Sequence, residues 1–127
     1  MKRIEKIKEL NLTNLGNLFL IELIPNDGNI YEGIGEAVIT YNEECFNLHI
    51  FEGIFKKQYI KSLEYKFADI KDVEFGKYGF KHPYVQIYFE EDLYLVFSYY
   101  LKIKNFSNQE ENIKHFFNIL GEIEVQL

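Results

Sequence analysis

The stretch EYKFADIKDVEFGKYGF, residues 64–80, decides which folds this 127-residue chain can adopt. It begins like a β-strand, but residues 68–72, ADIKD, form an acidic and polar step. Such a step suits neither a regular strand nor a long helix. Residues 70–75 then resume strand-like spacing, with Ile70 and Val73 as apolar anchors. The pattern therefore predicts two strands joined by a short turn.

Alternating apolar residues predict further strands before this step. Residues 17–24 and 29–41 are expected to form a long, curved hairpin, because PNDGN between them is a strong turn signal. Residues 45–51 alternate cleanly, and His49 falls on their outer, solvent-facing side. The last expected strand before the step covers 58–67, and Lys61 interrupts its predicted apolar face of Tyr59, Leu63, Tyr65 and Phe67.

A second hairpin is expected after the step, over residues 84–90 and 93–100. A three-residue acidic loop would pair Phe89 with Leu93 and keep the apolar positions of both strands on one side. The same register pairs Tyr88 with Tyr94 on the outer side. The expected inward residues are Val85, Ile87, Phe89, Leu93, Leu95, Phe97 and Tyr99.

The chain is expected to close with an amphipathic helix. Ser107 and Glu110 have the spacing of a capping box, and Gly121 is the expected end of the helix. Residues 1–10 are read as a short or frayed helix, and 122–127 as a tail that adds a short strand. The expected buried stripe of the closing helix is Ile113, Phe116, Phe117 and Leu120.

Several antiparallel strands followed by one helix resemble the pleckstrin-homology-like (PH-like) family in its bacterial and GRAM-like forms. GIGEAVITYNEECFNLHI, YKFADIKDVEFGKYG, YVQIYFEEDLYLVFSYY and SNQEENIKHFFNIL carry the resemblance, over about residues 30–120. It implies a mainly β (α+β) fold: an antiparallel β-sandwich or partly open barrel of six to seven strands, capped by one C-terminal α-helix. It also implies that the chain crosses to the second sheet at Phe67–Ile70. We expect one domain over 1–127, with its core at about 17–121.

Two features depart from that family. The closing helix has no tryptophan, which many eukaryotic members carry. The loops equivalent to the family's basic lipid-binding loop, residues 25–29 or 42–44, contain no Lys or Arg. We therefore do not expect headgroup binding by that route.

Composition excludes several kinds of function. Cys45 is the only cysteine, so neither an internal disulfide nor a multi-cysteine zinc site can form. The three histidines are far apart in the sequence, and no nucleophile–base motif is evident, so we expect no enzyme, metal or cofactor. The net charge of −6 argues against nucleic-acid binding. Without an evident targeting or membrane-spanning segment, we expect a cytoplasmic protein.

Lysines gather around the opening stretch of an otherwise acidic chain. Residues 56–81 contain seven lysines, and an anionic membrane attracts each nearby lysine by about 1 kcal/mol. Acidic neighbours such as Glu64 and Asp69 weaken this interpretation, so we expect peripheral membrane contact only as an alternative. The candidate anion-binding residues are Lys56, Lys57, Lys61 and Lys66.

Tyrosines on the outer side of the late hairpin are the second candidate surface. Aromatic pairs across strands stabilise sheets, but an exposed aromatic patch also marks interfaces. We expect a non-enzymatic interaction module that binds a protein partner or a second copy of itself. The alternatives are an immunity-type protein that neutralises a basic toxin and a small barrel around an apolar ligand. The candidate interaction residues are Tyr84, Tyr88, Tyr94 and Tyr100.

Overall fold

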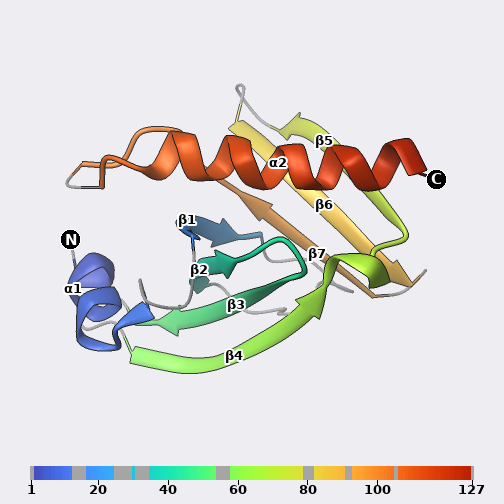
Figure 1. The fold of residues 1–127 in the computed structure, drawn as a ribbon. Helices are drawn as coiled ribbons and strands as arrows, with labels where there is room; N and C mark the ends of the chain where they lie inside the picture. Colours follow the sequence, from blue (N-terminus) through green and yellow to red (C-terminus); the bar gives the residue numbers. More distant parts are fainter. Residues whose placement is uncertain are drawn as a thin grey trace.

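The computed structural model describes residues 2–12, 17–24, 30, 35–53, 58–78, 82–90, 93–104 and 106–126 (Figure 1). Seven antiparallel strands form one sheet with the order β4-β3-β2-β1-β7-β6-β5. The sheet is not closed within the described residues, and the expected mainly β fold with a C-terminal helix is confirmed. The elements are α1 (Lys2–Glu9), β1 (Asn17–Leu23), β2 (Gly35–Tyr41), β3 (Cys45–Glu52), β4 (Gln58–Lys66), the 3₁₀ turn η2 (Phe67–Asp69), β5 (Asp72–Tyr78), β6 (His82–Glu90), β7 (Leu93–Ser98) and α2 (Gln109–Gln126).

The acidic step carries the chain from one edge of this sheet to the other. β4 and β5 are consecutive in the sequence but stand at opposite ends of the strand order. Between them the chain turns once as η2, which buries Phe67, and Ile70 is buried directly after it. The Phe67 amide donates to the Glu44 carbonyl at 3.0 Å, and the Lys71 amide donates to the Tyr88 carbonyl at 2.7 Å. The step is therefore tied both to the β2–β3 turn and to β6.

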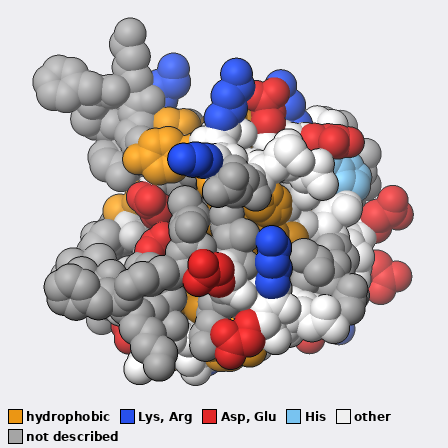
Figure 2. Space-filling model, turned by 90° about the vertical axis from the view of Figure 1, so that its left-hand side faces the viewer, with side chains coloured by type: hydrophobic (Ala, Val, Ile, Leu, Met, Phe, Trp, Pro, Cys, Tyr) orange, Lys and Arg blue, Asp and Glu red, His pale blue; other side chains and the backbone are white. Residues whose placement is uncertain are grey.

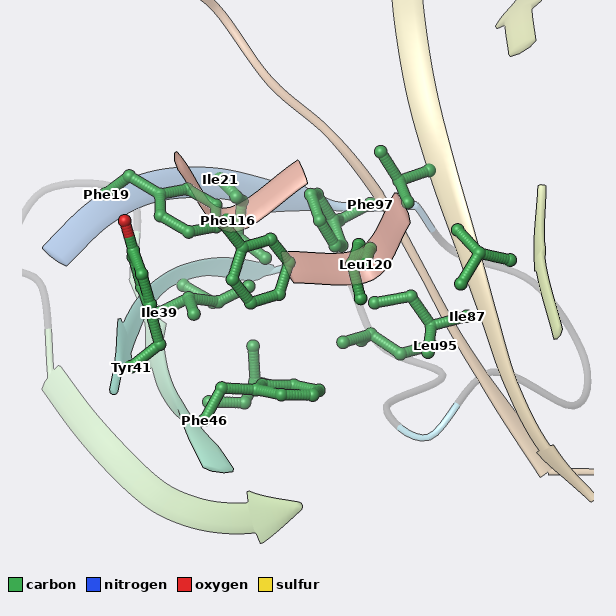
Figure 3. Packing of buried hydrophobic residues seen from close by; sticks show 14 of the residues in the cluster. Phe19, Ile21, Ile39, Tyr41, Phe46, Ile87, Leu95, Phe97, Phe116 and Leu120 are labelled. Atoms are coloured by element: carbon green, nitrogen blue, oxygen red, sulfur yellow. The ribbon is translucent and has the colours of Figure 1, made fainter. Parts of the chain in front are cut away.

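Helix α2 covers the inner face of the sheet and joins its two halves (Figure 1). Its stripe is as expected: Ile113, Phe116 and Leu120 are fully buried, and Phe117 is half-buried. The Phe116 ring lies 5.0 Å from that of Phe19 and 5.5 Å from that of Phe46, between centroids. Figure 3 shows the helix side chains in one interior with residues of both halves: Phe19, Ile39, Tyr41, Phe46, Ile87, Leu95 and Phe97.

A second core lies on the opposite face of β1–β3, under α1. Ile7 of α1 and Leu12 after it are buried against the outward side chains of the three strands. His49 lies in this layer, on the outer side of β3 as expected, but it is only 4% exposed, so its expected solvent-facing position is wrong. The pattern misled because both faces of these strands are covered, whereas alternation distinguishes faces only when one of them meets water. The strand residues of this second core are Leu18, Leu20, Val38 and Phe51.

Two bulges change the expected registers. In β4, Lys61 pairs with Ile50 but Tyr59 pairs with Phe51, so Ile60 is the extra residue. The Tyr59 ring therefore packs against Phe51 in the second core, and its expected place beside Leu63 is wrong. A bulge reverses which face the residues beyond it point to, so Tyr59 and Lys61 do not share one face. Lys61 therefore ends the row that Leu63 and Tyr65 begin and does not interrupt it.

The late hairpin contains the other bulge. Tyr88 pairs with Tyr94 as expected, but Leu93 pairs with Glu90 rather than with Phe89. Leu93 is 41% exposed, so its expected inward position is wrong, while Phe89 is buried. As the extra residue, Phe89 stacks on Tyr65 of β4, with ring centroids 4.7 Å apart. The bulge thus brings Phe89 of β6 against Tyr65 of β4, although the two strands are not neighbours in the sheet.

Helix α2 also extends further than expected. It continues through Gly121 to Gln126, so the expected stop at Gly121 and the expected short strand over 122–127 are wrong. A Cβ at Gly121 would meet no atom within 4 Å. Without tight packing or a left-handed backbone, this glycine has no reason to end the helix.

Candidate functional site

The β5–β6 face is the outer surface made by six residues at alternating positions of β5, β6 and the start of β7. Strand register places Asp72, Tyr88 and Tyr94 in one row across the three strands. Val96 and Ser98 follow on the same side of β7 but are buried. The accessible part of this face therefore lies on β5, β6 and the start of β7. The members of the β5–β6 face are Asp72, Glu74, Tyr84, Gln86, Tyr88 and Tyr94.

Tyr88 and Tyr94 form the centre of this face. Their ring centroids are 5.8 Å apart, and the rings are tilted by 45° to each other. The Tyr88 hydroxyl donates to Glu74 Oε2 at 3.2 Å. Partial burial, this hydrogen bond and the negative charges of Glu74 and Asp72 raise the pKa of Tyr88. The phenol is therefore a neutral donor at physiological pH, next to two carboxylates.

Tyr84 and Tyr100 lie apart from that pair. Tyr84 is four residues before Tyr88 on β6, and its ring lies over Gly76 of β5. A Cβ at Gly76 would come within 2.6 Å of the Tyr84 hydroxyl, so any side chain there would displace the Tyr84 ring. Tyr100 follows the end of β7 and is 50% exposed. The structure thus brings together two of the four predicted tyrosines and places a third on the same face.

The carboxylates of Asp72 and Glu74 were missed as part of this surface. Their spacing of two residues within a strand places them on one face, and the spacing of Tyr84 and Tyr88 does the same. The pairing of β5 with β6, which the sequence does not reveal, brings the two faces together.

The predicted anion-binding lysines do not form one described surface. Lys56 and Lys57 lie outside the described residues. Lys61 and Lys66 are both exposed on β4, but they are five residues apart and so alternate to opposite faces of the strand. On the face that Figure 2 shows, which carries α1, the described acidic and basic side chains are mixed.

Lys66 instead lines a surface hollow of about 410 Å³ at the start of β3, together with Glu43, Glu44 and Glu64. Cys45 lies in the same hollow. Partial burial raises the pKa of the Cys45 thiol, and a hydrogen bond to Glu64 and the charge of Glu64 act in the same direction. The thiol is therefore protonated at neutral pH, which is the opposite of what a cysteine nucleophile needs.

The remaining titratable groups show no common centre. No group of three His, Cys, Asp or Glu residues in the described part of the chain could hold a metal ion. His49 is buried in the second core, His115 is exposed on α2, and the side chain of His82 lies outside the described set. No described helix is both long enough and apolar enough to cross a membrane.

Comparison of the chain with protein-family models, with curated proteins and with solved structures finds no match. The resemblance to PH-like proteins therefore stays a prediction.

Proposed function

We propose that this chain is a non-enzymatic interaction module that binds a protein partner through the β5–β6 face. One observation carries the proposal: this face keeps a pair of contacting tyrosines partly exposed, whereas α2 covers the inner face of the sheet and α1 covers the outer face of β1–β3. Interfaces are enriched in tyrosine, because the ring provides a large and rigid contact area with a polar end.

The other kinds of function considered from the sequence have less support. The hollows of about 410 and 230 Å³ lined by described residues lie at the surface and carry charged side chains. Neither is the enclosed apolar cavity that a buried apolar ligand needs. A protein that neutralises a basic toxin is the second candidate, because the net charge of −6 and the carboxylates beside the tyrosine pair favour a basic partner.

Affinity capture from the native cell followed by mass spectrometry tests the proposal. The wild-type chain should retain a specific protein, and the double variant Tyr88→Ser, Tyr94→Ser should lose it. A matched control is Lys61→Ser, an exposed change on β4, which should capture the partner as the wild type does. Equal capture by the double variant would remove the β5–β6 face as the interface. Sedimentation of the same proteins reveals whether the partner is a second copy of the chain.

A further inference from the structure

The chemistry of the β5–β6 face selects among partners, because its aromatic pair has carboxylates on one side. Asp72 is the register partner of Tyr88, and Glu74 accepts a hydrogen bond from the Tyr88 hydroxyl through one carboxylate oxygen. Asp72 accepts the Val73 amide through Oδ1 at 2.9 Å. Among the described residues, each carboxylate therefore uses one oxygen within the fold, and its second oxygen can accept from another donor.

Nothing cationic among the described residues neutralises this side of the strand. Neither Asp72 nor Glu74 forms an ion pair with a described lysine or arginine. Lys77, the lysine of β5, occupies an odd position in this strand and so alternates to the side opposite the two carboxylates. The β5–β6 face therefore presents two negative charges beside two aromatic rings.

This combination fits a cationic side chain. The face of a tyrosine ring attracts a cation, and arginine binds there most often because its planar guanidinium stacks on the ring. The same guanidinium can donate to a carboxylate at the edge of the ring, whereas a lysine ammonium does so only as a point charge. A net charge of −6 would further attract a basic partner toward the molecule.

We propose that Tyr88, Tyr94, Asp72 and Glu74 form a seat for an arginine side chain of the protein partner. The guanidinium stacks on the tyrosine pair and donates to the outer oxygens of the two carboxylates. This inference rests on the proposed function, since it names the chemistry of the partner at the same face.

Titration of the ¹⁵N-labelled 127-residue chain with short capped peptides tests the seat by NMR. The probes are a glycine–serine peptide with three arginines and two matched peptides, in which the arginines are replaced by lysine or by uncharged citrulline. The arginine peptide should shift the amide signals of residues 72–74, 88 and 94 at low salt. The lysine peptide should bind more weakly, and the citrulline peptide should leave these signals unchanged. Equal binding of arginine and citrulline peptides would overturn the seat.

Variants separate the seat from general attraction to an acidic protein. Glu74→Gln and Tyr88→Leu should each weaken the arginine peptide by roughly three- to tenfold, which is the size of one cation–π or charge-assisted contact. Tyr88→Phe should retain most of the affinity, because it keeps the ring. Glu64→Gln removes one charge on β4, away from the face, and should bind as the wild type does. An equal loss in Glu64→Gln would overturn the seat.

The two proposals can fail separately. If capture of the natural partner depends on Tyr88 and Tyr94 but the arginine peptide does not bind at the β5–β6 face, the arginine seat is overturned and the interface stands. If the double tyrosine variant captures the partner unchanged, the proposed function itself is overturned.

Discussion

The two halves of the sheet differ in how many of their faces are covered. β1–β3 are buried on both sides, by α2 with the main core and by α1 with the second core. In β5 and β6 the inward residues Val73, Val85 and Ile87 are buried, while Asp72 and Glu74 on the other side are exposed. A half that is covered on both sides can supply most of the stability, which leaves the open face of the other half available for binding.

The largest effect is expected in the covered half, at Phe116. Its ring contacts those of Phe19, Tyr41, Phe46 and Phe67, and the side chain is fully buried. Phe116→Ala should reduce the free energy of unfolding by about 3–5 kcal/mol, because it removes buried apolar area and leaves a cavity. Denaturant unfolding measures the loss. Asn118→Ala, an exposed change on the same helix, should stay within about 0.5 kcal/mol of the wild type. A comparable loss in both variants would show that α2 is not docked as described.

A smaller effect is expected at Gln109, where helix α2 begins. Among the described residues, the register of β1 with β7 covers Glu22 and Leu23 and does not reach Leu20, so the Leu20 backbone has no strand partner on that side. The Gln109 side chain takes the place of a neighbouring strand. Its Oε1 accepts a hydrogen bond from the Leu20 amide at 2.9 Å, and its Nε2 donates to the Leu20 carbonyl at 2.7 Å. Gln109→Ala should cost about 1–3 kcal/mol, since it leaves a buried donor and acceptor unpaired.

Gln109→Glu provides the matched comparison for this bond pair. A carboxylate can still accept from the Leu20 amide but cannot donate to the Leu20 carbonyl, so this variant should also be less stable than the wild type at neutral pH. If neither substitution changes the unfolding midpoint, the two hydrogen bonds do not hold α2 to the edge of β1.

The second core predicts a dependence on pH. His49 hydrogen bonds to Thr40 Oγ1 at 2.9 Å through Nε2, and its Nδ1 has no partner among the described residues. Burial lowers the pKa of His49 below its usual 6.5. The unfolded chain therefore binds this proton more readily than the folded chain. The contribution of His49 to the free energy of unfolding should be fully present above about pH 6.5, and it should be lost as the pH falls below that value.

Unfolding measurements between pH 7.5 and 5 test this expectation against His49→Gln, which cannot titrate in that range. The variant should be less sensitive to acid than the wild type. An identical change of stability with pH in the two proteins would mean that protonation of His49 does not open the second core.

Tyr41 gives the corresponding expectation in alkali. Its hydroxyl donates to the Asn112 carbonyl at 2.6 Å, and burial raises the pKa of Tyr41 to about 12. This contribution is complete below about pH 10 and is lost as the pH rises toward 12, because the phenolate cannot donate. Tyr41→Phe should remove that part of the alkaline destabilisation, although it should be less stable at neutral pH. Absorbance of tyrosinate alongside unfolding curves measures both.

The sequence predicted the parts of the fold that depend on local pattern. The pairing of 17–23 with 35–41 and of 84–88 with 94–98, the stripe of α2 and the Tyr88–Tyr94 contact follow from alternation, turn residues and helical spacing. The expected turn at 25–29 and residues 31–34 of the expected second strand lie outside the described residues. The second core did not follow, because covering the outer face of β1–β3 depends on where α1 docks. The bulges at Ile60 and Phe89 each add one residue that no propensity marks, so Tyr59 and Leu93 were placed on the wrong faces.

The candidate site was predictable only in part for the same reason. Tyr88 and Tyr94 share one hairpin, so their contact was available from the sequence. Asp72 and Glu74 join them because β5 returns along β6 after the chain has crossed from the other edge of the sheet. Spacing alone placed the two carboxylates on one face of a strand but could not identify the strand beside it.

The smallest effect on stability is expected on the open face itself. An exposed cross-strand aromatic pair contributes about 0.2–1 kcal/mol, so Tyr88→Ser with Tyr94→Ser should shift the unfolding midpoint far less than Phe116→Ala does. Denaturant unfolding of the double variant measures this at the pH used for partner capture. A small shift together with lost capture would mean that the pair serves binding rather than the fold. A loss of several kcal/mol would instead make the tyrosines part of the structural core, and the contrast between the covered and open halves would then be wrong.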